Sequence, residues 1–244
     1  MADSRDALDL PVAILAGGLA TRLLPLTENL PKSLVDVAGK PFLERQLTLL
    51  RNEGVRRVVL CLGHLASQVQ SRFGDGAAFG LHITYSIDGP SPLGTGGAIL
   101  KALPNLGSEF LVTYGDSYLP VNFRQVVAAF RTSARPALMT VYRNRDRFDK
   151  SNVSFNESEI LEYSKNSRSG RMQHIDYGLM AFHASVFQRY PEDRKIDLAD
   201  ILTDLVHARK LAGLEVGQRF YEIGSLEGLA ELNRIFNDSN SFTP

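Results

Sequence analysis

Hydrophobic and polar positions along the chain form blocks whose spacing switches between that of strands and that of helices. Apolar or alternating runs at 12–15, 56–62 and 80–87 predict strands, and amphipathic segments at 41–53 and 65–73 predict helices between them. A chain that alternates strand and helix builds a mostly parallel sheet with helices on both faces. The pattern therefore predicts an α/β fold: a Rossmann-like, three-layer α/β/α arrangement around a mixed, mostly parallel central sheet.

The rest of the chain continues this pattern without a flexible linker, an internal repeat or a low-complexity tract. After residue 143 the composition shifts toward Asn, Asp, Ser, Arg and Lys, and this half is interpreted as an extension of the same sheet. Asp197 is the expected N-cap of a late helix, and the tail at 237–244 is expected to fray. The remaining expected strands are 110–114, 136–142, 152–155, 160–163, 174–183, 214–216 and 219–223, and the remaining expected helices are 94–103, 120–133, 197–208 and 226–236.

A polar loop follows the first predicted strand; it begins at Gly17-Gly18 and carries Arg22 and Lys32. Glycines leave backbone N–H groups open to a ligand, and an Arg and a Lys supply the charge that phosphate oxygens require. The loop is neither the dinucleotide-binding fingerprint nor a P-loop, because G-x-G-x-x-G and Gly-Lys-Ser/Thr are both absent. It indicates a phosphate site, or else only a tight turn with two solvated basic side chains.

Two further stretches place ligand-binding groups near strand ends. Gly94-Thr95-Gly96-Gly97 opens a predicted helix, a position at which a planar base or an anion fits against the backbone. Asp116 follows the strand at 110–114, where sheets of this kind bind ligands, and its carboxylate suits Mg²⁺. Taken alone, the first stretch is also consistent with a ligand-free helix cap, and the second with a solvated turn residue.

Composition and charge exclude several classes of function. The 27 basic residues balance 27 acidic ones, so no overall charge recruits nucleic acid or an anionic membrane. The single cysteine, Cys61, lies in an apolar run and is expected to be buried rather than catalytic or metal-binding. A polar N-terminus and the lack of an apolar stretch of ~20 residues predict a cytoplasmic protein with no signal peptide and no transmembrane helix.

The full pattern around the first loop, L-A-G-G-x-x-T-R-L-x-P-L-T followed by P-K-S-L, resembles the signature of the sugar-1-phosphate nucleotidyltransferases, the enzymes that make nucleotide-sugars. The segment P-L-G-T-G-G-A is similar to the second loop of that family, and the resemblance covers most of the chain. It implies a single nucleotidyltransferase domain of GT-A-like fold over residues 1–244, with a nucleotide-binding half at about 11–135 and a sugar-phosphate-binding half at about 136–237.

The resemblance also implies a role for each matched residue. Arg22 and Lys32 correspond to the catalytic basic pair, and Asp116 with Glu222 to the Mg²⁺ ligands. The two glycine loops would bind the nucleotide, and later segments the sugar phosphate. The implied nucleotide-binding residues are Leu15, Ala16, Gly17, Gly18, Thr21, Pro92, Gly94 and Thr95, and the implied sugar-phosphate-binding residues are Gly115, Lys165, Asp176 and Gly178.

Three matched segments depart from the family pattern. Ser164-Lys165 stands where the family has Glu-Lys. Asp176 stands where the family has an Asn that meets sugar hydroxyls, so two N–H donors are replaced by acceptors. Glu222 replaces the second metal-binding Asp, and Ser225-Leu226 replaces the Thr-Pro that follows it. Because a Glu reaches one methylene further, this last departure bears on the geometry of the metal more than on its binding.

The implied reaction joins a sugar 1-phosphate and a nucleoside triphosphate to give a nucleotide-sugar and pyrophosphate. The second loop and the short length look most like guanylyltransferases acting on D-glycero-D-manno-heptose 1-phosphate or mannose 1-phosphate; uridylyltransferases acting on glucose or N-acetylmuramate 1-phosphate are the alternative. The length is expected to exclude a C-terminal acyltransferase or β-helix domain. The expected partners are these small-molecule substrates only, with a homodimer left open.

Two other classes of function share features with this sequence. The substituted Asp176 and Glu222 favour a catalytically silent relative that binds a nucleotide-sugar and regulates a partner, whereas the retained Arg22, Lys32 and Asp116 argue against it. A glycosyltransferase with a similar nucleotide-binding half would carry an Asp-x-Asp metal motif after its fourth or fifth strand, and no such motif stands there. The sequence therefore favours an active nucleotidyltransferase.

Overall fold

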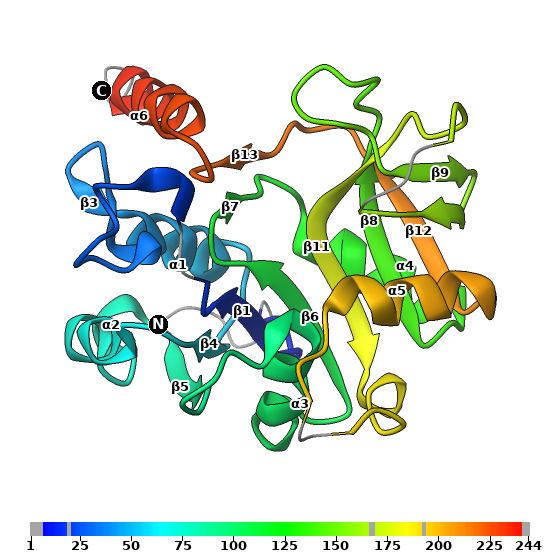
Figure 1. Ribbon diagram of the computed structural model, residues 1–244, viewed down its shortest axis with the longest axis horizontal. Coiled ribbons are helices and arrows are strands. Elements are labelled where there is room, and N and C mark those ends of the chain that lie inside the picture. Colours follow the sequence, from blue (N-terminus) through cyan, green and yellow to red (C-terminus); the bar gives the residue numbers. More distant parts are fainter. Residues whose placement is uncertain (1–6, 19–20, 166–168, 192–193, 241–244) are drawn as a thin grey trace.

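A nine-stranded mixed sheet forms the centre of the molecule (Figure 1). The computed structural model describes residues 7–18, 21–165, 169–191 and 194–240. The strand order is β5-β4-β1-β6-β11-β8-β12-β10-β9, and only β10 and β11 run against the other strands of this sheet. The predicted mostly parallel sheet is therefore confirmed. Its strands are β1 (Val12–Ala16), β4 (Arg57–Leu62), β5 (His82–Ile87), β6 (Glu109–Tyr114), β8 (Ala137–Tyr142), β9 (Val153–Asn156), β10 (Glu159–Tyr163), β11 (Ile175–His183) and β12 (Leu211–Val216).

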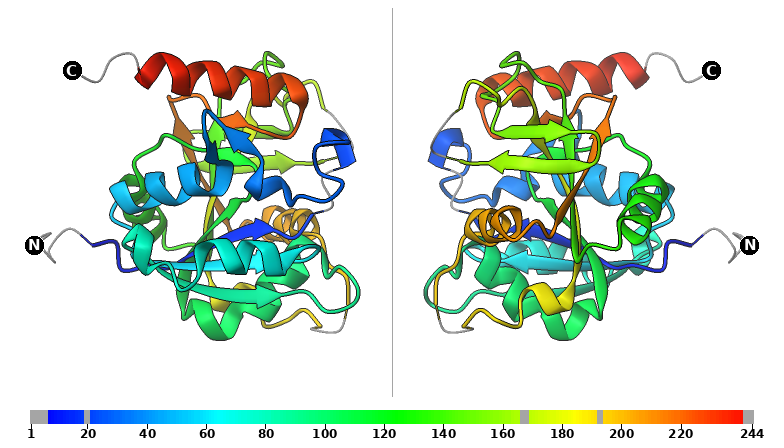
Figure 2. Two further views of the ribbon diagram at one scale, coloured as in Figure 1. Left: turned by 90° about the vertical axis from the view of Figure 1, so that its left-hand side faces the viewer. Right: turned by 90° about the vertical axis from the view of Figure 1, so that its right-hand side faces the viewer.

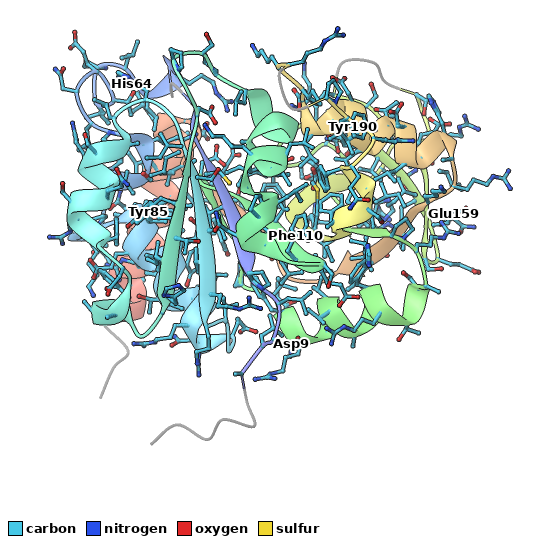
Figure 3. All side chains as sticks on the ribbon, turned by 90° about the horizontal axis from the view of Figure 1, so that it is seen from below. Asp9, His64, Tyr85, Phe110, Glu159 and Tyr190 are labelled. Atoms are coloured by element: carbon cyan, nitrogen blue, oxygen red, sulfur yellow. The ribbon has the colours of Figure 1, made fainter. Side chains whose placement is uncertain are left out.

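Helices cover both faces of this sheet because alternate strand residues point to opposite faces. On β1, Val12 and Ile14 belong to the core beneath α1 (Phe42–Asn52), α2 (Ala66–Phe73) and α4 (Phe123–Ser133). Ala13 and Leu15 belong to the core beneath α3 (Gly94–Leu106) and α5 (Leu198–His207). Phe110, fully buried on β6, lies near the centre of the molecule seen from below (Figure 3). The predicted α/β/α layering is thus confirmed.

The carboxyl ends of β1, β4, β5 and β6 meet at one edge of the sheet. Ala16 pairs with Leu62, Leu62 with Ile87, and Leu15 with Tyr114. The loops that follow cross so closely that a Cβ on Gly63 would lie 2.7 Å from the carbonyl oxygen of Gly17, and a Cβ on Gly115 would lie 2.6 Å from the Cβ of Ala16. These glycines let the loops converge at the edge where α/β sheets bind ligands.

A smaller subassembly lies beyond the sheet, built around α6 (Leu226–Asn240). In both side views this helix runs along the top of the molecule (Figure 2). It packs with two short antiparallel strand pairs. One is the hairpin of β2 (Asp36–Val37) and β3 (Lys40–Pro41), and the other joins the distant strands β7 (Ser117–Tyr118) and β13 (Tyr221–Glu222). Among the described residues, the short 3-10 helices are η2 (Thr21–Leu23), η3 (Lys32–Leu34), η4 (Ala77–Phe79) and η5 (Ala184–Val186).

The structure corrects several element boundaries. The α6 helix continues through 237–240, which the sequence predicted to fray; 241–244 lie outside the described residues. β12 begins at Leu211, three residues before the predicted start, and α3 continues to Leu106. Asp197 caps α5 as predicted, accepting a hydrogen bond from the Ala199 N–H. No helix in the described part of the chain is both long and apolar enough to cross a bilayer.

Candidate active site

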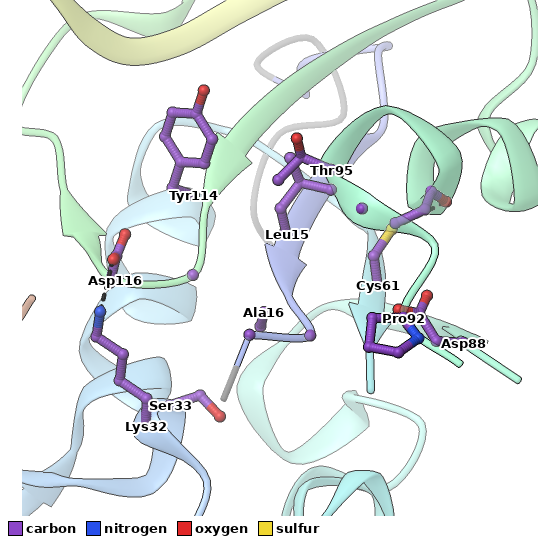
Figure 4. Close-up of a pocket in the computed structure, with 15 residues that line it drawn as sticks. Leu15, Ala16, Lys32, Ser33, Cys61, Asp88, Pro92, Thr95, Tyr114 and Asp116 are labelled. Atoms are coloured by element: carbon purple, nitrogen blue, oxygen red, sulfur yellow. Dashed lines mark hydrogen bonds and ion pairs between the residues drawn. The ribbon is translucent and has the colours of Figure 1, made fainter. Parts of the chain in front are cut away.

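A cavity of about 280 Å³ opens at the converging strand ends. Lys32 and Asp116 lie on one side of the Leu15–Ala16 backbone, and Cys61 and Asp88 lie on the other (Figure 4). The cavity brings together residues from both glycine loops and from the loop after β6. The lining residues are Leu15, Ala16, Gly17, Gly18, Lys32, Ser33, Cys61, Asp88, Pro92, Gly94, Thr95, Ala98, Tyr114, Gly115 and Asp116.

Lys32 and Asp116 form an ion pair at one end of this cavity. The Lys32 ammonium lies 2.7 Å from Oδ2 of Asp116, and both side chains are largely buried. The Ser117 hydroxyl lies 3.3 Å from Oδ1 of Asp116. From α1, the Gln46 side-chain amide donates to the carbonyls of Tyr114 and Ser117 at 2.8 and 2.9 Å, which fixes the turn that carries Asp116. The turn is therefore held from both sides before any ligand arrives.

Glu222 reaches the same region from the far end of the chain. β13 pairs with β7, so Glu222 stands opposite Ser117, and the Ile223 N–H donates to the Asp116 carbonyl at 2.9 Å. Burial raises the pKa of Glu222, the Asp116 charge raises it further, and Arg22 and Lys32 oppose this rise. Nη2 of Arg22 lies 3.2 Å from the point that a Cβ on Gly224 would occupy. Arg22 thus lies on the Glu222 side of the site and does not line the cavity itself.

The carboxylates of Asp116 and Glu222 fit a divalent cation. Burial and then the Asp116 charge raise the pKa of Glu222, so the two carboxylates lie close enough to act on each other. Within the described ranges, no group of three or more His, Cys, Asp or Glu side chains could hold a metal ion. A site with one or two carboxylates completed by phosphate oxygens is the arrangement typical of Mg²⁺. Asp116 and Glu222 are therefore the residues that would hold such an ion.

Lys165 and Thr95 both contact the carboxylate of Asp197, a residue that the sequence predicted only as a helix cap. The Lys165 ammonium contacts both oxygens of Asp197, at 3.0 and 2.8 Å, and the Thr95 hydroxyl donates to Oδ1 of Asp197 at 2.9 Å. The same hydroxyl accepts from the Leu198 N–H at 2.8 Å. Lys165 is half exposed at the end of β10, so its amine is accessible to a ligand.

The glycines of the second loop serve a packing role that the sequence did not predict. The N–H groups of Gly96 and Gly97 donate to the Ile196 carbonyl at 2.9 and 3.2 Å, so they are occupied by the protein itself. A Cβ on Gly94, where φ is +75°, would lie 2.4 Å from that carbonyl oxygen. The expectation that an anion or a base binds to the backbone of this loop is therefore wrong for the Gly96 and Gly97 amides. Gly94 and Thr95 still line the cavity.

Asp176 lies at a β-bulge in β11, close to Tyr114 and Lys165. The register with β8 shifts between Asp176 and Met180, and Gly178 within that interval has φ +96°. The Gly178 N–H donates to Oδ1 of Asp176 at 2.9 Å. Burial raises the pKa of Asp176 to about 6, against the opposing effects of Gly178, Lys165 and the Tyr114 hydroxyl. Bulges commonly redirect a side chain beside an active site, and this one leaves an acidic group near Tyr114 and Lys165.

Three residues of the site escaped the sequence analysis. Gln46 is a polar residue on the otherwise apolar buried face of α1, and this was its only signal in the sequence. Asp88 follows β5 at the same sheet edge as Asp116. It could have been found from the rule that sheets of this kind bind ligands at the carboxyl ends of their strands. Asp197 was recognised as a cap but not as the partner of Lys165.

Cys61 is buried as predicted and forms part of the cavity wall. The side chain of Thr21 lies outside the described residues.

Comparison of the sequence with known proteins shows the family to which the chain belongs. The family model described as nucleotidyl transferase matches residues 12–238. The chain belongs to this nucleotidyl transferase family. It is 41% identical over 122 residues to the N-acetylmuramate alpha-1-phosphate uridylyltransferase of Neisseria meningitidis, covering 50% of this chain and 52% of that protein. It is 26% identical over 211 residues to the D-glycero-alpha-D-manno-heptose 1-phosphate guanylyltransferase of Campylobacter jejuni, covering 86% of this chain and 93% of that one.

Several relatives are matched by this chain over only part of their length. The glucose-1-phosphate thymidylyltransferase of Streptomyces antibioticus is 42% identical over 125 residues, which span 51% of this chain and 35% of that protein. The chain thus spans about half the length, or less, of several curated relatives. Among solved structures, HddC from Yersinia pseudotuberculosis complexed with GMP-PN has a TM-score of 0.77 at 24% identity, covering 93% of this chain and 99% of that one. The family and fold predicted from the sequence are confirmed.

Proposed function

We propose that this nucleotidyl transferase moves a nucleotidyl group from a nucleoside triphosphate to a sugar 1-phosphate, releasing pyrophosphate. The observation that carries the proposal is the meeting of Lys32, Asp116 and Glu222 from three distant chain segments beside a glycine-lined cavity. Two polyanions must come together in this reaction. The basic residue at one end of the cavity, Lys32, would contact phosphate oxygens. The two carboxylates beside it, Asp116 and Glu222, would hold a cation that neutralises further phosphate charge.

In the proposed reaction, an oxygen of the sugar phosphate attacks the α-phosphorus in line. The new bond joins that oxygen to the α-phosphorus, the bond to the β-phosphate oxygen breaks, and pyrophosphate leaves. No side chain acts as nucleophile, because the sugar phosphate already carries one, so the protein positions reactants and stabilises charge. Lys32 contacts the α-phosphate and the sugar phosphate, Arg22 the β- and γ-phosphates, and Lys165 the sugar phosphate.

Mg²⁺ is the proposed cofactor, held by Asp116 and Glu222. When bound, the ion neutralises charge on the phosphate oxygens that it contacts. The Lys32 ammonium pairs with Asp116, so this carboxylate would be shared between the ammonium and the ion. With Asp116 neutralised by a cation, the Lys32 ammonium would be available to phosphate.

GTP is the proposed nucleotide, with D-glycero-D-manno-heptose 1-phosphate or mannose 1-phosphate as the sugar. Asp88 supports this choice, because it lies on the side of the cavity away from the Lys32–Asp116 pair and its carboxylate only accepts hydrogen bonds when ionised. Guanine offers two adjacent N–H donors on one edge, whereas uracil places a single N–H between two carbonyl oxygens. The backbone of residues 15–17 and the loop at Pro92–Thr95 complete the base site.

A uridylyltransferase acting on glucose or N-acetylmuramate 1-phosphate is the second candidate. It is favoured by the 41% identity to the Neisseria meningitidis enzyme over 122 residues. In either case, the nucleotide-binding half is proposed at about 11–135 and the sugar-phosphate-binding half, with Asp176 and Gly178, at about 136–237. The two candidates differ only in the base and the sugar, so one experiment separates them.

That experiment measures pyrophosphate release over a grid of the four nucleoside triphosphates and UTP's analogue dTTP against the named sugar 1-phosphates. Each pair is measured with Mg²⁺ and again after chelation with EDTA. Metal-dependent release with GTP and a manno-configured sugar is the expected result, and release with UTP alone would select the second candidate. Release of any kind excludes a silent regulatory relative. Silence with every pair would contradict the proposed function.

A further inference from the structure

We propose that Asp197 is a positioning residue of the sugar-phosphate site, which holds the ammonium of Lys165 in place and ties it to the second glycine loop. This inference rests on the proposed function, because Lys165 is assigned there to the sugar phosphate. It concerns a carboxylate that belongs to neither the basic pair nor the metal ligands.

Asp197 has more contacts than a helix cap requires. An N-cap needs one side-chain oxygen to accept from a backbone N–H in the first turn, and Oδ1 does so with Ala199 at 3.0 Å. Oδ1 also accepts from the Thr95 hydroxyl, and Oδ2 accepts from the Lys165 ammonium at 2.8 Å. The capping role therefore accounts for only one of these interactions.

The second oxygen constrains a side chain that would otherwise be mobile. Lys165 follows the end of β10, its side chain is half exposed, and a free lysine loses rotamer entropy when it is immobilised. Contact with both carboxylate oxygens leaves at least one ammonium N–H free for a phosphate. The ion pair thus orders the lysine before the substrate arrives, and this lowers the entropic cost of binding.

The platform that carries Asp197 is itself rigid. Thr95 bridges the Asp197 carboxylate and the Leu198 N–H, and the Ile196 N–H donates to the Leu93 carbonyl at 2.9 Å. The N-termini of α3 and α5 are therefore joined by hydrogen bonds in both directions. Burial acts to raise the pKa of Asp197, but the hydrogen bonds from Lys165, Ala199 and Thr95 lower it overall, so the group is charged at neutral pH.

Asp197→Asn isolates the ion pair from the cap. Asparagine caps helices as well as aspartate does, and its carbonyl oxygen still accepts from Ala199 and Thr95. Its amide nitrogen cannot accept from the ammonium and the side chain is neutral, so Lys165 loses the ion pair and the contact with Oδ2 and keeps at most the contact with the carbonyl oxygen. We expect the KM for the sugar 1-phosphate to rise about tenfold, as for loss of a charge-assisted hydrogen bond, with the KM for the nucleotide unchanged.

Three companion variants complete the experiment. Lys165→Gln should raise the same KM at least as much as Asp197→Asn, and the double variant should be no worse than Lys165→Gln, because the two residues act as one unit. Asp200→Asn, which removes an exposed carboxylate one residue beyond Ala199 on the same helix, is the matched control and should leave both KM values unchanged. Thermal unfolding of each variant checks that the fold is retained.

The possible outcomes separate this inference from the proposed function. A wild-type enzyme that turns over, with Asp197→Asn leaving the sugar-phosphate KM unchanged or lowering it, would overturn the positioning role alone. A lowered KM would mean that the carboxylate competes with phosphate for Lys165. Additive effects in the double variant would overturn the coupling to Lys165. No pyrophosphate release by the wild type with any substrate pair would instead overturn the proposed function, and this inference with it.

Discussion

At the scale of single residues, both lysines of the site are paired with carboxylates of the protein. Lys32 contacts Asp116, and Lys165 contacts Asp197, each at 3.0 Å or less. Each pairing neutralises a cation beside the cavity and keeps its ammonium group at a fixed point. Phosphates and a metal ion that bind there would share these residues with their present partners.

The first prediction concerns Lys32→Ala. Because this side chain faces the cavity end where charge develops on the phosphates, we expect kcat for nucleotidyl transfer to fall about 100-fold, as when other enzymes lose one such donor. The fold should remain, since only one ion pair is lost. Lys40→Ala is the control, because Lys40 forms a comparable pair with Glu44 on the exposed surface. A Lys32→Ala enzyme with wild-type turnover would contradict the assignment.

The second prediction concerns the pH dependence contributed by Asp176. Its pKa of about 6 in the folded state exceeds the ordinary value of 3.8, so the folded state holds the proton more tightly than the unfolded state. Stability is therefore lost as pH rises from 4 to above 6, by up to about 3 kcal/mol. Asp176→Asn removes this loss. We expect the variant to match the wild type near pH 4 and to be more stable at pH 7.5.

Urea unfolding of both proteins at the two pH values measures this effect. The difference in unfolding free energy between variant and wild type should grow with pH. Asp200→Asn serves again as control, because it makes the same substitution at an exposed carboxylate. An Asp176→Asn variant that is less stable than the wild type at pH 7.5 would show that the carboxylate has a stabilising partner.

At the scale of elements, the sequence predicted each of the larger helices and strands but not the way in which their ends join. Periodicity located α1, β4 and β6 to within one or two residues. It could not locate β2, β3 and β7, whose two-residue strands are too short to show an alternation. Nor could it show that the Gly94–Gly97 segment packs on Ile196, because a glycine required by a neighbouring backbone looks the same in sequence as one required by a ligand.

The third prediction separates these two reasons for glycine at position 94. A Cβ there would lie 2.4 Å from the Ile196 carbonyl oxygen, and φ is +75°. We expect Gly94→Ala to lower the free energy of unfolding by about 2 kcal/mol or more. The loss comes from backbone strain at residue 94 and from displacement of the Ile196 backbone that packs against it. Gly217→Ala is the matched control, because a Cβ there meets nothing within 4 Å and its φ is ordinary. Chemical denaturation without ligands measures both; equal stability would mean that packing does not require Gly94.

At the scale of the whole molecule, the site joins parts of the chain that are distant in sequence. The sequence predicted that Lys32, Gly17, Thr95 and Asp116 would share one sheet edge, and the structure brings all four to one cavity. That success came from matched motifs and from the rule that parallel strands end together. The supporting contacts of Gln46 and Asp197 could not be predicted, because a hydrogen bond between elements more than 60 residues apart leaves no local pattern.

Because binding at such a site involves both ends of the chain, a ligand that binds only the folded state should stabilise the whole fold. A nucleoside triphosphate with Mg²⁺ at 100 times its dissociation constant contributes about 2.7 kcal/mol. For a protein of this size we therefore expect Tm to rise by roughly 5–10 °C, and the rise to shrink when EDTA replaces Mg²⁺.

Glu222→Gln tests whether this effect depends on the second carboxylate. β13 brings Glu222 beside Asp116, so the variant should lose most of the Mg²⁺-dependent part of the shift and keep the part given by nucleotide alone. Glu227→Gln, an exposed change five residues further on, should keep both parts. The measurement is thermal unfolding with nucleotide, with Mg²⁺, with both and with neither. If Glu222→Gln retained the full metal-dependent shift, Asp116 alone would hold the ion, and the α6 subassembly would close the site without contributing a ligand to it.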